Sequence, residues 1–383
     1  MSIEDLVELS RHFGKNPDYV LAGGGNTSWK DGKTLFVKGS GMALADVAAD
    51  SFVKMDRKAL ARIWEKSYPE SSAVDPFGSR RESAVLADMM AARESGEESK
   101  RPSVETLLHD IMPFNLVVHL HPALVNGLTC SNRGEAAMTE IFGEGVIWIP
   151  STNPGYVLSK TVKTAMDAYS AKHGKPAAII FLQNHGVFVG DNSAKGIKET
   201  YGEIMHKIGA WIKRRPDFFD EMRESCDASF ALIPGPVSEV IKTLQELAGF
   251  VVIMRAKELA ALVKDRASFA PLSSAFTPDH IVYAGSNPLF TEANDGAALK
   301  EAWKTHTDKT GRIPKIVAVR DLGVFGVAPT EKAANLALDL FRDAVKVAVY
   351  AESFGGPLAM SQEQIDFINN WEVETYRAKV SVK

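Results

Sequence analysis

The sequence is poor in several features that mark large classes of protein. Only two cysteines, Cys130 and Cys226, occur in 383 residues, which is too few for a disulfide framework or a cysteine-built zinc site and is typical of a reducing compartment. No apolar run approaches the roughly 18 residues of a membrane helix, and the acidic start Met1-Ser2-Ile3-Glu4-Asp5-Leu6 is unlike a signal peptide. We therefore expect a soluble, cytoplasmic protein without a membrane partner, whose metal sites, if present, use histidine and carboxylate.

The chain also lacks an excess of charge of one sign. It has 44 basic and 48 acidic residues, a formal charge of −4, and no basic tract that could follow a phosphate backbone. These numbers argue against nucleic acid as a partner. The hydrophobic content of 45% is enough for a well-buried core in one large domain or two ordinary ones.

Hydrophobic periodicity predicts alternating strands and helices. The expected strands are 34–37, 116–121, 146–150, 178–182, 186–190 and 315–319, and the expected helices are about 3–12, 56–66, 82–93, 103–112, 159–173, 194–212 and 331–348. Turns are expected at 21–28 and 38–41 because of their glycines. Since Arg214-Arg215-Pro216-Asp217 interrupts a helical pattern, we divide the chain into residues 1–220, a catalytic domain, and 236–383, a C-terminal α/β domain.

The C-terminal domain contains a segment that is similar in sequence to one in the first domain. Asn184-His185-Gly186-Val187-Phe188-Val189-Gly190 can be laid against Asp321-Leu322-Gly323-Val324-Phe325-Gly326-Val327, and in each case a predicted strand precedes the motif and a predicted helix follows it. Leu322 then stands where the first motif has His185. This pattern is as compatible with chance as with a degenerate repeat, and we predict a structural role for the C-terminal half.

Three histidines lie where predicted strands end. His119 and His121 are separated by one residue on an apolar, β-branched segment, so both side chains leave the same face of a strand. His185 follows another predicted strand at once. Three such imidazoles match the ligands of a catalytic zinc centre, with one position left for substrate. A polar strand face is the alternative for the His119 and His121 pair, but the three together favour a metal site, and imidazole also accepts cobalt, nickel or iron.

Glu105 is the candidate general base. It lies 14 residues before His119, in the first turn of the helix predicted after Pro102, where the helix dipole also favours a carboxylate for purely structural reasons. His109 lies four residues further on and can share its helix face. Of three roles for His109, which are orienting the carboxylate, responding to pH and packing, we favour packing.

Two glycine-rich turns, Gly25-Asn26-Thr27-Ser28 and Gly39-Ser40-Gly41, supply backbone N–H groups and small hydroxyls of the kind that bind phosphate. Glycine-rich turns also serve geometry alone. Neither turn follows the dinucleotide pattern G-x-G-x-x-G or the P-loop pattern G-x-x-x-x-G-K-[ST], so a Rossmann enzyme and a P-loop NTPase are poor fits.

Taken in order, these two turns, Ser103-x-Glu105, His119-x-His121-Pro122 and Asn184-His185-Gly186 resemble the class II aldolase and adducin family. That family includes fuculose-1-phosphate and rhamnulose-1-phosphate aldolases and ribulose-5-phosphate 4-epimerase. The resemblance covers about residues 20–212. Residues 106–114 look most like the aldolase part of bifunctional rhamnulose-1-phosphate aldolase/alcohol dehydrogenases, whose separate dehydrogenase domain this chain is too short to include.

The resemblance implies a three-layer α/β/α domain with a central, mostly antiparallel sheet, and a homo-oligomer. It implies an enzyme of carbohydrate metabolism, in which Zn²⁺ stabilises the enediolate formed when a phosphorylated ketose is cleaved reversibly to dihydroxyacetone phosphate and an aldehyde. The implied zinc ligands are His119, His121 and His185, the implied acid/base is Glu105, and the implied phosphate-binding residues are Asn26, Ser40, Gly41 and Ser103. The chain departs from the family where Val104 replaces a small hydroxyl residue.

Two alternatives stay open at this stage. A sugar-phosphate 4-epimerase or a related decarboxylating lyase would use the same three histidines. A non-catalytic, adducin-like binding module would normally lose these ligands, whereas His119, His121 and His185 are all present here.

Overall fold

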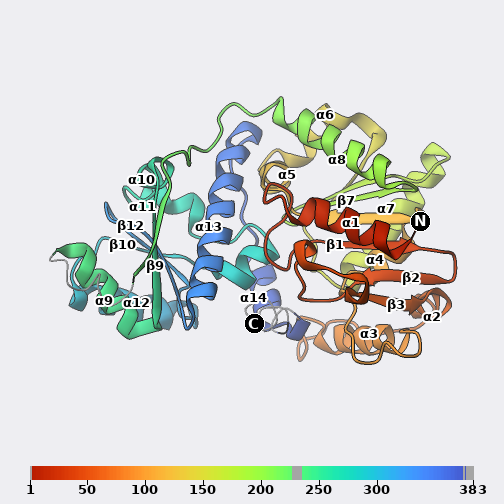
Figure 1. Cartoon of the computed structure of the whole chain (residues 1–383), viewed down its shortest axis with the longest axis horizontal. Helices are drawn as coiled ribbons and strands as arrows, with labels where there is room; N and C mark the ends of the chain where they lie inside the picture. Colours follow the sequence, from red (N-terminus) through yellow and green to blue (C-terminus); the bar gives the residue numbers. More distant parts are fainter. Residues whose placement is uncertain (1, 227–234, 374–375, 377–383) are drawn as a thin grey trace.

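The chain forms two sheets, each covered by helices (Figure 1). The computed structural model describes residues 2–226, 235–373 and 376. The first half of the chain forms a seven-stranded sheet, and the second half forms a five-stranded sheet. Within the described ranges, no helix has the length and apolar character needed to cross a membrane.

The first sheet has the strand order β3-β2-β1-β4-β7-β6-β5, and only β5 and β6 run parallel. Its strands are β1 Asn26–Lys30, β2 Thr34–Lys38, β3 Phe52–Asp56, β4 Leu116–Leu120, β5 Ile147–Ile149, β6 Ile179–Leu182 and β7 Gly186–Asp191. The helices of this half are α1 Ile3–Gly14, α2 Arg57–Ile63, α3 Ser79–Ala91, α4 Thr106–Ile111, α5 Ala123–Thr129, α6 Gly134–Phe142, α7 Tyr156–His173 and α8 Ala194–Gly209. This mostly antiparallel sheet is the one that the resemblance implied.

Helices cover both faces of this sheet, as alternation along β4 requires. Leu116, Val118 and Leu120 pack into a core with α1 and α8. Val117, on the opposite face, packs with α4 and α7. The first half is therefore a three-layer α/β/α unit, and His119 leaves β4 on the same face as Val117, toward the layer that contains α4.

The second sheet has the order β10-β11-β12-β9-β8. Its strands are β8 Met222–Cys226, β9 Phe250–Arg255, β10 Leu289–Thr291, β11 Ile316–Val319 and β12 Gly323–Ala328. Its helices are α9 Pro236–Ala248, α10 Lys257–Leu262, α11 Arg266–Phe269, α12 Gly296–Thr310, α13 Glu331–Ala351 and α14 Gln362–Asn370, and a π-helical turn, η6, spans His280–Ala284.

The second sheet repeats the topology of the first. In β5-β6-β7-β4 the successive pairs are parallel, antiparallel and antiparallel, and β10-β11-β12-β9 shows the same sequence of pairings. Left-handed residues stand at matching turns, Asn184 with φ 56° and Asp321 with φ 61°. The sequence similarity between residues 184–190 and 321–327 is therefore accompanied by the same order of strand pairings around them.

The ligand positions are not repeated. His119 pairs with Phe188 in the first sheet, and Ile253 pairs with Phe325 in the second. This register places Ile253 at the position of His119 and Arg255 at that of His121, while Leu322 stands at that of His185. The second sheet therefore has the same order of strand pairings without the imidazoles.

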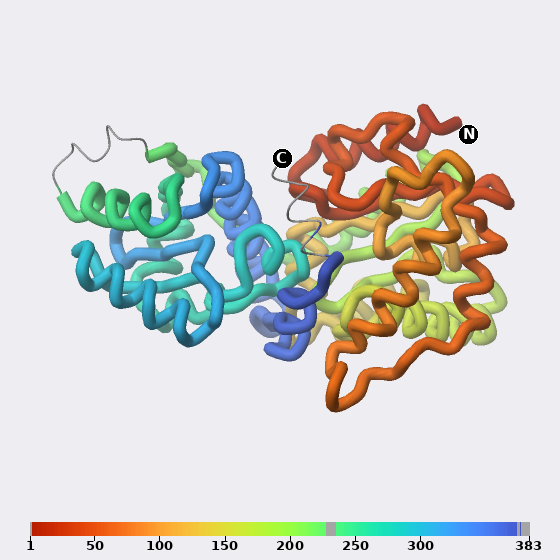
Figure 2. Tube along the Cα trace, turned by 90° about the horizontal axis from the view of Figure 1, so that it is seen from below, coloured from red at the N-terminus to blue at the C-terminus, as the bar shows by residue number. Residues whose placement is uncertain are grey.

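The long helix α13 lies between the two sheets (Figure 1). It packs against α5 of the first half, where a Cβ on Gly127 would lie 2.3 Å from Cβ of Tyr350. Only glycine at position 127 allows this approach of the two helices. In the orthogonal view the segment that ends in α14 returns to the first half (Figure 2), where Asn184 donates to the Leu358 carbonyl at 2.8 Å.

Two sequence expectations need correction. Asn26–Ser28 was expected in a turn but belongs to β1, because these residues pair with β4. Phe52–Asp56 is a strand, β3, that the sequence analysis did not predict. Met222–Cys226 falls between the two expected domains and pairs with β9. Residues 227–234 of that expected boundary lie outside the described residues, and the exact division into domains stays a prediction.

Candidate functional site

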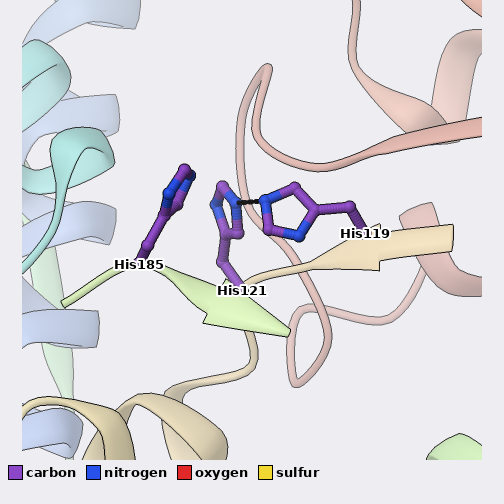
Figure 3. Close-up of side chains that lie close together, drawn as sticks. All are labelled: His119, His121 and His185. Atoms are coloured by element: carbon purple, nitrogen blue, oxygen red, sulfur yellow. Dashed lines mark hydrogen bonds between the residues drawn. The ribbon is translucent and has the colours of Figure 1, made fainter. Parts of the chain in front are cut away.

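Three imidazoles converge at the ends of neighbouring strands (Figure 3). His119 is in β4, His121 follows its end, and His185 lies in the turn between β6 and β7. One ring nitrogen from each lies within 4.8 Å of one from each of the others. The predicted cluster is therefore assembled by the pairing of β4 with β7.

Each strand histidine is held through its outer ring nitrogen. Nδ1 of His119 lies 3.1 Å from the Val187 carbonyl, and Nδ1 of His121 lies 2.6 Å from Oδ2 of Asp279. A proton on each Nδ1 satisfies these contacts and leaves both Nε2 atoms as acceptors. The two Nε2 atoms then face each other at 2.9 Å, an arrangement that a cation between them stabilises.

Burial favours the neutral form of His119 and His185. It lowers the pKa of His119 well below the ordinary value, and the neighbouring His121 lowers it further. Burial also lowers the pKa of His185 to about 3 despite the opposing effect of Glu105. Neutral imidazoles are the form that binds a metal ion.

Glu105 faces the histidine cluster. It is the residue before α4, with φ −91° and ψ 12°, and not in the first helical turn as expected, and its carboxylate does not cap the helix. Oε1 lies 3.4 Å from Nε2 of His119 and 3.5 Å from Nε2 of His185. Among the described residues this buried oxygen has no hydrogen-bond partner.

A hydrogen-bond network holds the other carboxylate oxygen. Nδ2 of Asn26 donates to Oε2 of Glu105 at 2.6 Å and to Oγ of Ser103 at 3.2 Å. His109 contacts Oδ1 of Asn26 through Nε2 and Oγ of Ser28 through Nδ1. His109 therefore orients Asn26, and the expectation that it only packs is incomplete.

The end of α4 is fixed by a buried lysine. Nζ of Lys30 donates to the carbonyls of His109, Asp110 and Met112, and burial lowers the lysine pKa to about 7. Charged donors at a helix C-terminus stabilise the helix. Lys30 thus fixes the helix that begins beside Glu105.

We expect Lys30→Met to lower the free energy of unfolding by about 2–3 kcal/mol, because it leaves several buried carbonyls without a hydrogen-bond donor. Urea unfolding followed by circular dichroism measures the change. Lys33→Met removes an exposed lysine nearby and serves as the control. Equal effects of the two substitutions would contradict this role of Lys30.

The site opens into a small cavity of about 40 Å³, which has room for a few water molecules. Both glycine-rich turns line it, and with them come the predicted residues Asn26, Ser40, Gly41, Ser103 and Glu105, together with His121 and His185. His119 is fully buried behind this lining. Binding of a ligand larger than a few water molecules therefore requires that the lining move.

Two residues near the site were not singled out from the sequence. Lys38, the last residue of β2, lines the cavity with 2% exposure and donates to the Met42 carbonyl at 2.5 Å. Its position before Gly39-Ser40-Gly41 was the available signal. Asp279 contacts His121 from the second half, and no local pattern marks it.

The donor set fits a divalent cation. Three imidazoles match the ligands of catalytic metal sites, and the oxygen of Glu105 that has no hydrogen-bond partner among the described residues faces two of them. A buried carboxylate oxygen without a donor is costly unless a positive charge compensates it. The three-histidine group can therefore bind a metal ion.

The half of the chain that contains these residues matches a known protein family. The family model for the class II aldolase and adducin N-terminal domain matches residues 4–204. The curated protein "Uncharacterized oxidoreductase YuxG" of Bacillus subtilis (strain 168) is 23% identical over 428 residues, which cover 98% of this chain. The chain spans 58% of that relative's length.

Among solved structures, the N-terminal class II aldolase domain of a conserved protein from Thermoplasma acidophilum is 25% identical, with a TM-score of 0.45. The match covers 55% of this chain and 93% of that one. An L-fuculose 1-phosphate aldolase is 14% identical, with a TM-score of 0.36, over 55% of this chain and 84% of its own.

Proposed function

Because the chain belongs to the class II aldolase and adducin family, we propose that it is a zinc-dependent lyase acting by reversible retro-aldol cleavage. Its substrate is a phosphorylated ketose, and its products are dihydroxyacetone phosphate and an aldehyde. The observation that carries the proposal is the carboxylate of Glu105, which has one oxygen held by Asn26 and the other turned toward His119 and His185.

His119, His121 and His185 would hold the metal. A divalent cation supplies Lewis-acid stabilisation of the negative charge that develops on substrate oxygens when a C–C bond beside a carbonyl breaks. The hydrogen bonds from Nδ1 of His119 and His121 fix both rings with Nε2 directed inward. Metal binding then requires little reorganisation of the chain.

Glu105 moves the proton in this mechanism. Its free oxygen Oε1 is the atom that accepts a proton from substrate or returns one to carbon. Asn26 and Ser103 keep the carboxylate in place, since Asn26 bonds to both. The amide of Asn26 is thus already used within the protein, which favours the second glycine-rich turn, Gly39-Ser40-Gly41, for direct contact with phosphate.

The phosphate would lie at the glycine-rich turns. Ser40 and Gly41 line the cavity beside Ser103, where the hydroxyl of Ser40 can donate to a phosphate oxygen. The backbone N–H of Ser40 already donates to the Arg101 carbonyl at 2.9 Å. Lys38 lies at the same wall, and a lysine beside these groups suits an anionic ligand. These residues favour a phosphorylated substrate over a neutral sugar.

The name of the Bacillus relative includes an oxidoreductase activity. The chain spans 58% of that protein's length, and its own candidate site, three histidines and a carboxylate, favours a lyase.

A screen of ketose 1-phosphates with the zinc-loaded protein tests the proposal. We expect at least one substrate to release dihydroxyacetone phosphate, detected by a coupled NADH assay, and we expect the reverse reaction from dihydroxyacetone phosphate and an aldehyde. Conversion of a ketose phosphate into its stereoisomer, without dihydroxyacetone phosphate, would instead identify a 4-epimerase. Zinc-loaded protein that is inert toward every phosphorylated ketose would contradict the lyase.

A further inference from the structure

The second half of the chain reaches the histidine cluster directly. Oδ2 of Asp279 lies 2.6 Å from Nδ1 of His121, across 158 positions of sequence. Both side chains are largely buried, with exposures of 8% for His121 and 6% for Asp279. Segments of the second half, coloured cyan and blue, border the cluster on the side of His185 (Figure 3).

The surroundings of Asp279 are built to hold it there. Asp279 immediately precedes η6, a kind of helical turn that occurs often at functional sites. The next residue, His280, contacts Oδ2 of Asp343 in α13 at 3.1 Å. Asp279 is therefore anchored through η6 to the helix that lies between the two sheets.

The first half leaves room for this carboxylate. A Cβ on Gly24 would lie 2.5 Å from Oδ2 of Asp279 and 2.9 Å from the Leu21 carbonyl. The glycine at position 24 thus allows an aspartate from the other half to approach His121. Gly24, directly before the first glycine-rich turn, is therefore explained by the close approach of Asp279 and not by phosphate binding.

We propose that Asp279 is a positioning residue that the second half supplies to the metal centre. Its carboxylate accepts a hydrogen bond from the Nδ1–H group of His121. This hydrogen bond fixes the tautomer and the ring orientation and raises the basicity of Nε2. Asp279 lies outside the three-histidine group and acts through His121, not as a ligand. The inference rests on the proposed function, since it requires that His121 bind a metal.

The same contact gives the second half a part in the site. At the positions that correspond to the three ligands, the second half has Ile253, Arg255 and Leu322. The segment of the second half between α11 and β10 contains Asp279, which contacts His121 of the histidine cluster. Pro278 and Val373 of the same half also line the cavity. The second half therefore contributes residues to the candidate site of the first half.

Zinc affinity of the full-length protein, measured by competition with a chromogenic chelator, tests the proposal. We expect Asp279→Ala to raise the zinc dissociation constant by about 10- to 100-fold, the usual effect of removing such a partner. Asp279→Asn keeps an acceptor of the same size without the charge, and we expect an intermediate rise. This near-isosteric variant also serves if Asp279→Ala fails to fold.

A matched control removes another buried carboxylate of the second half. Glu258, 6% exposed, bonds to Arg214 and to the Asp217 amide, so Glu258→Gln tests general destabilisation, and we expect unchanged zinc affinity. Wild-type affinity in Asp279→Asn and in folded Asp279→Ala would overturn the positioning role while leaving the proposed function intact. A wild-type protein that binds no zinc would instead overturn the proposed function itself.

Discussion

Replacing Glu105 with glutamine is expected to reduce turnover by at least 10²-fold while zinc stays bound. General acid–base catalysis contributes about 10²- to 10⁴-fold, and glutamine keeps the size of the side chain but cannot accept the proton. The amide oxygen can still receive the hydrogen bond from Asn26 that Oε2 accepts now. The loss should therefore fall on kcat and not on folding.

The measurement pairs kcat with zinc content from elemental analysis of the same preparation. Asp110→Asn is the matched control, because Asp110 is a buried carboxylate of the same helix that binds Arg57 at 2.5 Å instead of facing the histidines. Full activity of Glu105→Gln would remove Glu105 from its proposed role.

The metal-free protein is expected to lose stability steeply on acidification. Burial lowers the pKa of His185 to about 3 and that of His119 well below its ordinary value, whereas an unfolded histidine has a pKa near 6.5. Between these limits the unfolded state binds more protons, so the free energy of unfolding falls as the pH falls from about 6.5 toward 3. Each neutral buried histidine contributes about 1.4 kcal/mol per pH unit over this range.

Urea unfolding at pH values from 7.5 to 4.5, after removal of metal with a chelator, measures this slope. His185→Gln removes one of the responsible imidazoles, and we expect its slope to be shallower than that of the wild type. A wild-type free energy of unfolding that does not change over this range would show that the histidines are not buried as neutral groups.

The sequence was most informative where one element carries the chemistry. His119 and His121 share a strand face by the two-residue repeat, and the β-branched residues around them predicted β4 correctly. The placement of His185 beside them depends on β7 pairing with β4, which the strand prediction left open and the family resemblance supplied. The family resemblance also indicated the role of Glu105, although this residue precedes α4 and does not lie in its first turn.

The contacts that cross the fold could not be predicted. Asn26 was assigned to a turn because three glycines precede it, yet pairing with His119 draws it into β1. Its link to Glu105 follows only from that pairing. Asp279 is 158 residues from its partner His121, and a single aspartate before an irregular helical turn has no recognisable pattern. Local propensity carries no information about such tertiary contacts.

The proposed lyase depends on the binding of a metal ion by His119, His121 and His185. Elemental analysis of the purified protein, in parallel with a His119→Ala, His121→Ala double variant, tests this binding most directly. We expect about one zinc per chain in the wild type and none in the double variant. Absence of bound metal from the wild type, even after incubation with zinc, would contradict a metal-dependent lyase and favour a binding module on an aldolase-like scaffold.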